Sequence, residues 1–175
     1  MSRGLGDVYK RQGIIDQTKN ERLDQVYKEF CEDYKDAESD VQKVHRAMEL
    51  IKKITNGETN GFVNKKIQMY TLFSVMFDFV ENNIDVSESV IQMFLTFEQC
   101  YTIFKNEYDL QGETEEERKV LEYLKKYKLA SSEGVNKLSN RMIRFEVLKK
   151  ILLQFDSIES KVFELIKQRM EELVE

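Results

Sequence analysis

Residues 65–82 read KKIQMYTLFSVMFDFVEN and point most directly to the architecture of the chain. Apolar side chains occupy every side of a helix drawn through this stretch, whereas a surface helix keeps one polar face. We therefore expect a central helix that is buried on most sides. Its richest run, residues 72–80, is interrupted by Ser74 and Asp78 and is far shorter than the roughly 20 apolar residues of a membrane span.

A second apolar pattern follows directly along the chain. Ser87 is a suitable N-cap, because its hydroxyl can accept a backbone N–H of the first turn. After it, aromatic and aliphatic residues recur at helical spacing: Val90, Phe94, Phe97, Tyr101, Phe104 and Tyr108. This pattern predicts a helix over about 88–108. We expect the helices at 65–82 and 88–108 to form most of the core.

Further helical patterns precede and follow this pair. One covers about 20–34. Another runs from the acidic stretch 33–40, with Asp36 or Ser39 as N-cap, to about Thr55. Its expected apolar stripe is Val41, Val44, Met48 and Ile51, with Ala47, Leu50 and Ile54 beside it. The remaining predicted helices cover about 115–127, 138–155 and 157–173, and Thr114 with Glu117 predicts a capping box for the first of them.

Proline is absent from all 175 residues, and after Gly13 each glycine falls between two helical patterns. Hydrophobic residues make up 41% of the chain and charged residues 34%, which is a globular balance. The sequence therefore predicts an all-α fold, an irregular bundle of about six or seven helices.

The first twelve residues look unlike the rest. Their segment DVYKRQ, residues 7–12, resembles the translation of a transposase adapter used in sequencing libraries; a short native basic tail is the alternative. We expect residues 1–12 to be a non-native tail and 13–175 to be a single helical domain, a fragment of a larger protein. Without Arg3, Asp7, Lys10 and Arg11, the 27 basic and 32 acidic residues become 24 and 31, so the net charge falls from −5 to −7.

His45 is the only histidine. Glu38 and Glu49 lie on the same side of its predicted helix, so a metal site is conceivable, although the Glu-x-x-His spacing of carboxylate-bridged sites is missing. The alternative interpretation is that His45 has no chemical role and lies on the flank of its helix. No glycine-rich phosphate loop, paired CxxC or Cys/His dyad occurs. We therefore expect no catalytic residue, no metal site and no cofactor in this chain.

The two cysteines, Cys31 and Cys100, fall inside helical patterns and lack metal-ligand spacing. Such thiols are typical of a reducing compartment, and one long-range disulfide is the alternative. We expect a cytoplasmic protein.

One segment departs from the acidic background. Residues 119–150 contain three acids, Glu122, Glu133 and Glu146, and nine basic residues, namely Lys119, Lys125, Lys126, Lys128, Lys137, Arg141, Arg144, Lys149 and Lys150. The local excess of +6 attracts anions. Elsewhere the acidic chain disfavours broad, non-specific binding of a nucleic-acid backbone.

Two of these basic residues are unusually placed. Projection of the 138–155 helix puts Arg141 and Arg144 inside its apolar arc, where a guanidinium needs a partner. That partner is either a carboxylate or the C-terminal carbonyls of a helix in the same protein, or it is a phosphate. On the second alternative, Arg141, Arg144 and Lys137 are the candidate nucleic-acid or phosphate contacts.

Three segments together resemble a known family. They are FVNKKIQMYTLF at 62–73, YKLASSEG at 127–134 and NRMIRF at 140–145. In order and separation they resemble the helical C-terminal part, a domain of unknown function, of the GmrSD-type family of ParB-like nucleases. Arg141 and Arg144 are the positions that match.

The resemblance implies a two-part parent protein. In the family, an upstream ParB-like region carries an Asp-Gly-Gln-Gln-Arg motif for nucleotide hydrolysis or DNA cleavage, and members restrict invading DNA. This sequence contains neither that motif nor an HNH-like histidine cluster. The resemblance thus implies a non-catalytic fragment of a nucleotide-dependent DNA nuclease, partnered by the upstream region.

Three functions remain open at this stage. The first is a helical scaffold or recognition module of a restriction or anti-phage defence nuclease, which contacts DNA through the 119–150 side. The second is a stand-alone helical module for protein–protein interaction or oligomerisation. The third is a helical metalloenzyme that uses His45.

Overall fold

The structure is a computed structural model, and it describes residues 36–57, 61–104 and 110–173. Within these ranges there are helices and no strand, so the all-α prediction is confirmed. The helices are α3 (Ala37–Ile54), α4 (Lys66–Glu81), α5 (Glu88–Ile103), α6 (Glu115–Ser132), α7 (Leu138–Gln154) and α8 (Ser157–Glu172). The predicted tail 1–12, the predicted helix 20–34 and Cys31 lie outside the described residues.

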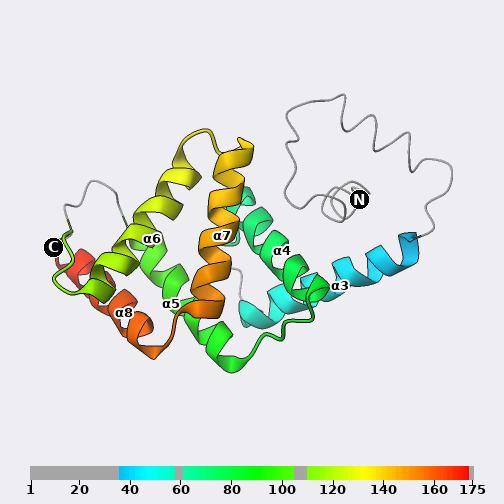
Figure 1. The fold of residues 1–175 in the computed structure, drawn as a ribbon, viewed down its shortest axis with the longest axis horizontal. Coiled ribbons are helices and arrows are strands. Elements are labelled where there is room, and N and C mark those ends of the chain that lie inside the picture. The colour runs from blue at the N-terminus through cyan, green and yellow to red at the C-terminus, as the bar shows by residue number, and fades with distance from the viewer. Residues whose placement is uncertain (1–35, 58–60, 105–109, 174–175) are drawn as a thin grey trace.

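The helices pack around α7, which crosses the middle of the view in Figure 1. Helix α4 packs on one side of α7 and α3 packs against α4, whereas α6 lies on the other side and α8 is packed against both α5 and α6. Helix α5 contacts α7 from behind and also reaches α3. This arrangement brings α4 and α7 side by side, although they are far apart in the sequence.

Helix α4 is buried on most of its surface, as its composition predicts. The expectation that α4 and α5 form most of the core is wrong, because the cluster of buried apolar residues draws on all six described helices. The reason is that each helix is short and contributes only a few side chains, while the central α7 alone adds Phe145, Val147, Leu148, Ile151 and Leu152.

Aromatic rings fill the space between the helices. Phe62 lies before α4 and makes edge-to-face contacts with Phe94, Phe97 and Tyr101 at centroid distances of 5.5–5.9 Å. It also stacks on Tyr127 of α6 at 6.4 Å. Such pairs stabilise a core by about 0.5–1.5 kcal/mol each beyond their buried area, so Phe62 links three parts of the bundle.

The predicted helix starts are largely confirmed. Ser87 caps α5 by accepting the Val90 N–H, and Thr114 caps α6 by accepting the Glu117 N–H at 3.1 Å. The Glu117 carboxylate, however, accepts the N–H of Glu113 at 2.8 Å and not that of Thr114. A complete capping box begins α8, between Asp156 and Glu159, and it was not predicted from the sequence.

Two elements differ from their predicted form. In α3, Val41 and Met48 are 53% and 40% exposed, whereas Ala47, Ile51 and Ile54 face the core. The buried face therefore follows the side of the expected pattern that carries Ala47 and Ile54, and of the expected stripe Val41 and Met48 lie outside that face. Helix α6 continues beyond Tyr127 to Ser132, and the hydroxyls of its last two serines donate to backbone carbonyls one turn earlier.

None of the described helices is both long and apolar enough to cross a membrane. The most apolar candidate, α4, has 16 residues and carries Asp78 in its last turn.

Candidate functional site

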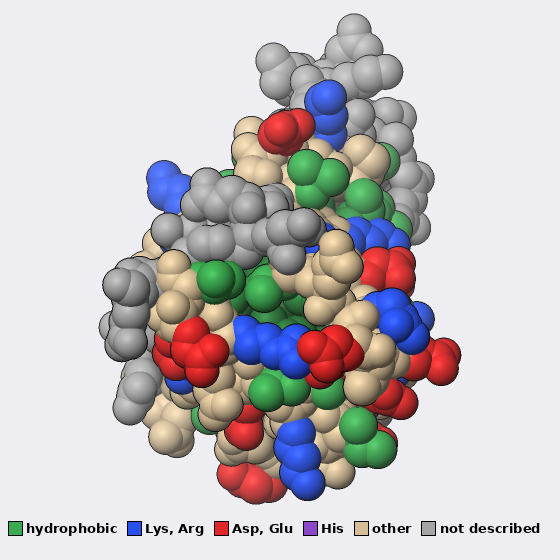
Figure 2. All heavy atoms as spheres, turned by 90° about the vertical axis from the view of Figure 1, so that its left-hand side faces the viewer, with side chains coloured by type: hydrophobic (Ala, Val, Ile, Leu, Met, Phe, Trp, Pro, Cys, Tyr) green, Lys and Arg blue, Asp and Glu red, His purple; other side chains and the backbone are tan. Residues whose placement is uncertain are grey.

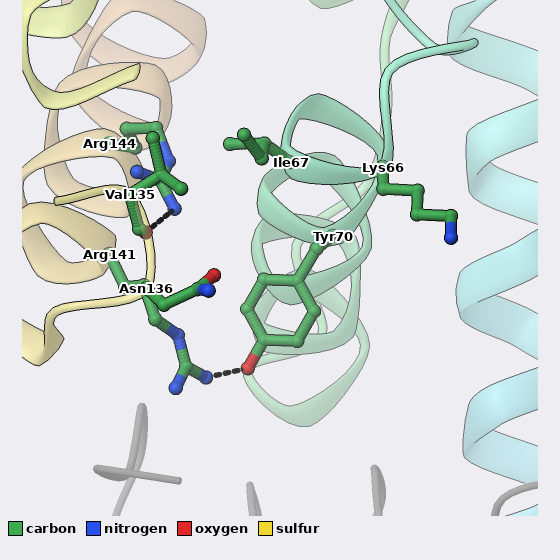
Figure 3. Close-up of a pocket in the computed structure, with 7 residues that line it drawn as sticks. All are labelled: Lys66, Ile67, Tyr70, Val135, Asn136, Arg141 and Arg144. Carbon is green, nitrogen blue, oxygen red and sulfur yellow. Dashed lines mark hydrogen bonds between the residues drawn. The ribbon is translucent and has the colours of Figure 1, made fainter. Parts of the chain in front are cut away.

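A cleft of about 510 Å³ opens between the first half of α4 and the start of α7. Its lining comes from three segments: Lys66, Ile67 and Tyr70 of α4, Val135 and Asn136 of the α6–α7 loop, and Arg141 and Arg144 of α7. Figure 3 shows Ile67 and Asn136 pointing into the space between the two helices, while Lys66 stands at the rim and points away from the arginines.

Arg144 is the most constrained of these side chains, with an exposed fraction of 2%. Its Nε donates to the Thr71 hydroxyl at 3.1 Å, one terminal nitrogen donates to the Ala130 carbonyl at 2.5 Å, and the other donates to the Val135 carbonyl at 3.0 Å. The guanidinium therefore joins α4, the last turns of α6 and the loop. These acceptors are uncharged, so the hydrogen bonds leave the positive charge of Arg144 in place.

Arg141 lies one turn before Arg144 and is 6% exposed. Its guanidinium donates to the hydroxyl of Tyr70, and its central carbon lies 4.7 Å from the centre of the Tyr70 ring (Figure 3). Burial is the main cause that lowers the pKa of Arg144, and the nearby charge of Arg141 lowers it further, against the opposing effect of Tyr127. The two buried cations are thus close enough to repel each other.

A hydrogen-bonded network of uncharged side chains lies in the core next to Arg144. The hydroxyl of Tyr127 donates to Gln68 Oε1 at 2.6 Å, and Gln68 Nε2 donates to the hydroxyl of Tyr101 at 2.9 Å. Burial raises the pKa of both tyrosines, so both stay protonated. The network fixes the core wall of α4 and so holds Thr71 in place for Arg144.

The α6–α7 loop is held by its own polar contacts. Gly134 has a φ of +51°, and an added Cβ would come within 2.9 Å of the Lys137 side chain. Asn140 donates through Nδ2 to the carbonyls of Glu133 and Gly134, at 2.6 and 3.2 Å. These contacts set the course of the loop and place Asn136 at the cleft.

The fold brings together only two of the three phosphate-contact residues that the sequence suggests. Arg141 and Arg144 line the same cleft, whereas Lys137 is exposed at the start of α7 and is not among the residues of the lining. For Arg144 the structure supplies the intramolecular carbonyls that the sequence left as one alternative. Phosphate contact by Arg141, Arg144 and Lys137 stays a prediction.

Two helices begin at this cleft, and both lack a side-chain cap. Helix α4 starts after Lys65 and α7 starts after Lys137, and neither lysine can accept a hydrogen bond from the first turn. By contrast, α5, α6 and α8 are capped by Ser87, Thr114 and Asp156. The positive ends of two helix dipoles therefore add to the cationic lining.

The other basic residues of the 119–150 segment do not share one partner surface. Lys119 pairs with Glu159 of α8, and Lys149 pairs with Asp78 of α4 at 2.7 Å. Figure 2 shows the side of the molecule where α6 and α8 lie, and there basic and acidic side chains are interspersed. The local excess of +6 in the sequence is thus spread over several faces and partly neutralised.

The three segments that carry the family resemblance contact one another in the structure. Phe62 and Gln68 of the first segment contact Tyr127 of the second. Arg141 and Arg144 of the third segment contact Tyr70 and Thr71 of the first. Segments that are up to 73 residues apart are therefore parts of one substructure.

His45 is exposed on α3, as are Glu38 and Glu49. Within the described ranges, no group of three or more His, Cys, Asp or Glu side chains is placed to hold a metal ion. Cys100 is a buried free thiol, and burial raises its pKa to about 12.

Sequence reasoning missed Lys66, Tyr70 and Asn136 as parts of the site. Lys66 and Tyr70 stand in an almost wholly apolar helix and Asn136 stands in a polar loop, so neither pattern marks them. One signal could have found Tyr70. An inward-facing arginine needs a hydroxyl, carbonyl or ring nearby, and Tyr70 and Arg141 both belong to the segments that carry the family resemblance.

Comparison with known proteins adds no relative, because no protein-family model, curated protein or solved structure matches the chain.

Proposed function

We propose that this chain is a non-catalytic helical module that recognises nucleic acid through the cleft between α4 and α7, as the scaffold and recognition part of a restriction or anti-phage defence nuclease. The observation that carries the proposal is the lining of the cleft. It includes the cations Lys66, Arg141 and Arg144, and none of the seven described lining residues is acidic.

The charges of the cleft suit a phosphate. Arg141 is preset, because it is buried and its guanidinium is held against Tyr70. Arg144 keeps its full positive charge, since Thr71, Ala130 and Val135 offer only uncharged acceptors. Guanidinium groups bind phosphate oxygens well, so an anion is favoured beside them.

The proposal narrows the DNA contact expected from the sequence. The 119–150 segment as a whole is interrupted by ion pairs, and the chain has a net charge of −5. A broad electrostatic surface is therefore a poor description of the binding site. A confined cleft that gathers a few cations accounts better for how an acidic chain recognises a polyanion.

The place of the module in a nuclease rests on the resemblance. Segments 62–73 and 140–145 line the cleft, and segment 127–134 contacts Arg144 through the Ala130 carbonyl, which supports the view that they carry a shared role. In this proposal, catalysis belongs to an upstream ParB-like region of the parent protein, and the helical module holds that region and the nucleic acid together in the cytoplasm.

Fluorescence anisotropy with labelled single-stranded and duplex oligonucleotides tests the proposal. We expect Lys66→Glu to weaken binding by about tenfold, because it reverses an exposed charge at the rim, and Lys66→Gln to lower the salt dependence of single-strand binding by about 0.7 in logarithmic slope. The matched control is Lys126→Glu, an exposed charge reversal on α6 within the same basic segment. Equal weakening by Lys66→Glu and Lys126→Glu would show that the cleft is not the site.

Oligomerisation is a second candidate function. Ile158 and Leu165 are exposed seven residues apart on α8, at 57% and 38%, and Leu173 follows that helix at 59%. Residues seven apart lie on one helix face, so Ile158 and Leu165 form an apolar strip that suits another helix. Sedimentation of the protein and of Ile158→Lys/Leu165→Lys tests this function. A monomer for the unmodified protein at high concentration rules it out.

A further inference from the structure

The cleft carries more than positive charge. Its lining also includes the ring of Tyr70, the aliphatic side chains of Ile67 and Val135, and the amide of Asn136. A phosphate alone would gain little binding energy from an aromatic ring, an apolar wall and a side-chain amide. The lining therefore favours a ligand in which a phosphate is joined to a flat or apolar group with a polar edge.

The size of the cleft agrees with such a ligand. Its volume of about 510 Å³ falls within the roughly 300–1,000 Å³ of pockets that bind small molecules. A free phosphate would leave most of this space to water. A base-paired duplex presents its backbone on a convex surface and keeps its bases stacked inside, so its bases cannot enter.

Arg141 and Tyr70 are placed for both parts of the ligand. The Arg141 guanidinium is fixed by the Tyr70 hydroxyl and lies 4.7 Å from the ring centre. Tyrosine rings and arginine planes are the surfaces on which unpaired bases stack, and asparagine amides pair with base edges. Figure 3 shows the amide of Asn136 directed into the space between Arg141 and Tyr70.

We infer that the cleft binds a nucleoside phosphate unit, with its phosphate at Arg141 and its base against Tyr70 and Asn136. This inference rests on the proposed function and names its ligand. The unit is either a free nucleotide or an unpaired nucleotide of a single strand, and both present the same chemistry. Arg144 is a positioning residue, because it ties Thr71 of α4 to the loop that carries Asn136.

Matched oligonucleotides test the inference. The probes are a labelled eight-nucleotide oligo(dT), a chain of eight abasic sites with the same phosphates, and a blunt duplex. We expect oligo(dT) to bind about tenfold more tightly than the abasic chain, since stacking of a base is the added contact. Equal affinity for the two single strands would overturn the inference and leave the proposed function intact, whereas no binding of any probe would overturn both.

Variants locate the preference. Tyr70→Leu is expected to abolish the preference for oligo(dT) over the abasic chain, whereas Tyr70→Phe keeps the ring and the preference. Tyr123→Leu is the control, because Tyr123 is a partly buried tyrosine whose ring packs on Phe155, away from the cleft. Circular dichroism is used to check that each variant is folded. A preference that survives in folded Tyr70→Leu contradicts the inference.

Competition separates the two sources of the ligand. Thymidine monophosphate that displaces oligo(dT) at an affinity close to that of the strand identifies a free-nucleotide site. Displacement only by longer single strands identifies a strand-binding site. Both outcomes support the nucleoside phosphate. Inorganic phosphate that competes as well as thymidine monophosphate overturns it, because the base would then contribute nothing.

Discussion

Charged side chains are buried at two places, the interface between α6 and α8 and the cleft between α4 and α7. The partners of these charges differ between the two places. At the first, the buried carboxylates of Glu117 and Glu159 pair with Arg169 and Lys119. Each carboxylate also accepts a backbone N–H at a helix start. At the cleft, Arg144 donates to uncharged oxygens.

This difference distinguishes charged groups that only stabilise the fold from charged groups that can also attract a ligand. An ion pair that also has its hydrogen bonds is complete and attracts no further ion. An arginine whose hydrogen bonds are made but whose charge is left over is anchored and still attracts an anion. The α6–α8 interface therefore serves stability, whereas the cleft, in the function proposed for it, combines stability with recognition.

The strongest test of this comparison is Arg144→Met, which keeps much of the side-chain volume. The change leaves the oxygens of Thr71, Ala130 and Val135 without their donor in a buried place. We expect the free energy of unfolding to fall by about 3 kcal/mol or more. Urea denaturation measures it, with the exposed Arg46→Met as control. A loss as small as that of the control would show that Arg144 does not anchor the cleft.

The corresponding test at the other interface is Glu117→Gln. The carboxylate lies 3.3 and 3.4 Å from two nitrogens of Arg169, and the amide keeps an acceptor for the Glu113 N–H but loses the charge. We expect a loss of about 2 kcal/mol in urea denaturation and unchanged oligonucleotide binding. Glu116→Gln, on the exposed side of the same turn, is the control. Weakened binding in Glu117→Gln would break the division between the two regions.

Gly134→Ala examines the loop that shapes the cleft. The residue has a φ of +51°, and the new methyl group would meet Lys137, so we expect a loss of about 1 kcal/mol. Gly61→Ala is the matched control, because no atom lies within 4 Å of its added Cβ. Thermal unfolding of both variants gives the comparison. Equal melting temperatures would mean that the loop adapts without strain.

The smallest expected effect is a pH dependence at the α6–α8 interface. Burial alone would raise the pKa of Glu159, but hydrogen bonds from Lys119 and from the Asp156 backbone outweigh it and lower this pKa from 4.5 to about 2. The stabilisation is therefore complete above about pH 4.5 and is lost as the pH falls towards 2. Because Lys119 is 41% exposed, water screens the pair and we expect only about 0.5–1 kcal/mol.

The measurement is the stability of the unmodified protein and of Glu159→Gln between pH 5 and about pH 2.5. We expect the difference between the two to shrink as the pH falls. Glu164→Gln is the control, since Glu164 is exposed on the same helix. A difference that stays constant over this window would show that the Glu159 carboxylate is not stabilised in its charged form.

Helical spacing predicts the elements well, because the spacing of apolar residues reflects burial directly. It fails on α3, where Asp40 is buried and Val41 and Met48 are exposed. The projection of a single helix cannot know on which flank its neighbours lie, and here α4 and α5 cover the flank that carries Ala47 and Ile54. Likewise, all six described helices contribute to the core, whereas the sequence pointed mainly to the two apolar patterns at 65–82 and 88–108.

The site could be predicted only in part. Arg141 and Arg144 stand out because a charged residue on an apolar arc needs a partner. The partners themselves come from α4 and from backbone carbonyls near the end of α6. Backbone carbonyls are common to every residue and leave no trace in a sequence. Only packing reveals which of them face a guanidinium.

The contacts of Arg141 with Tyr70 and of Arg144 with Thr71 span 71 and 73 residues of chain. Helix α4 can pair with the preceding α3 as soon as it is synthesised, whereas the opposite wall of the cleft is still missing. Contacts of such separation form late, because the loop between them must close first. During biosynthesis the helices can therefore form before the cleft does, and a nascent chain has no complete cleft until α7 has left the ribosome.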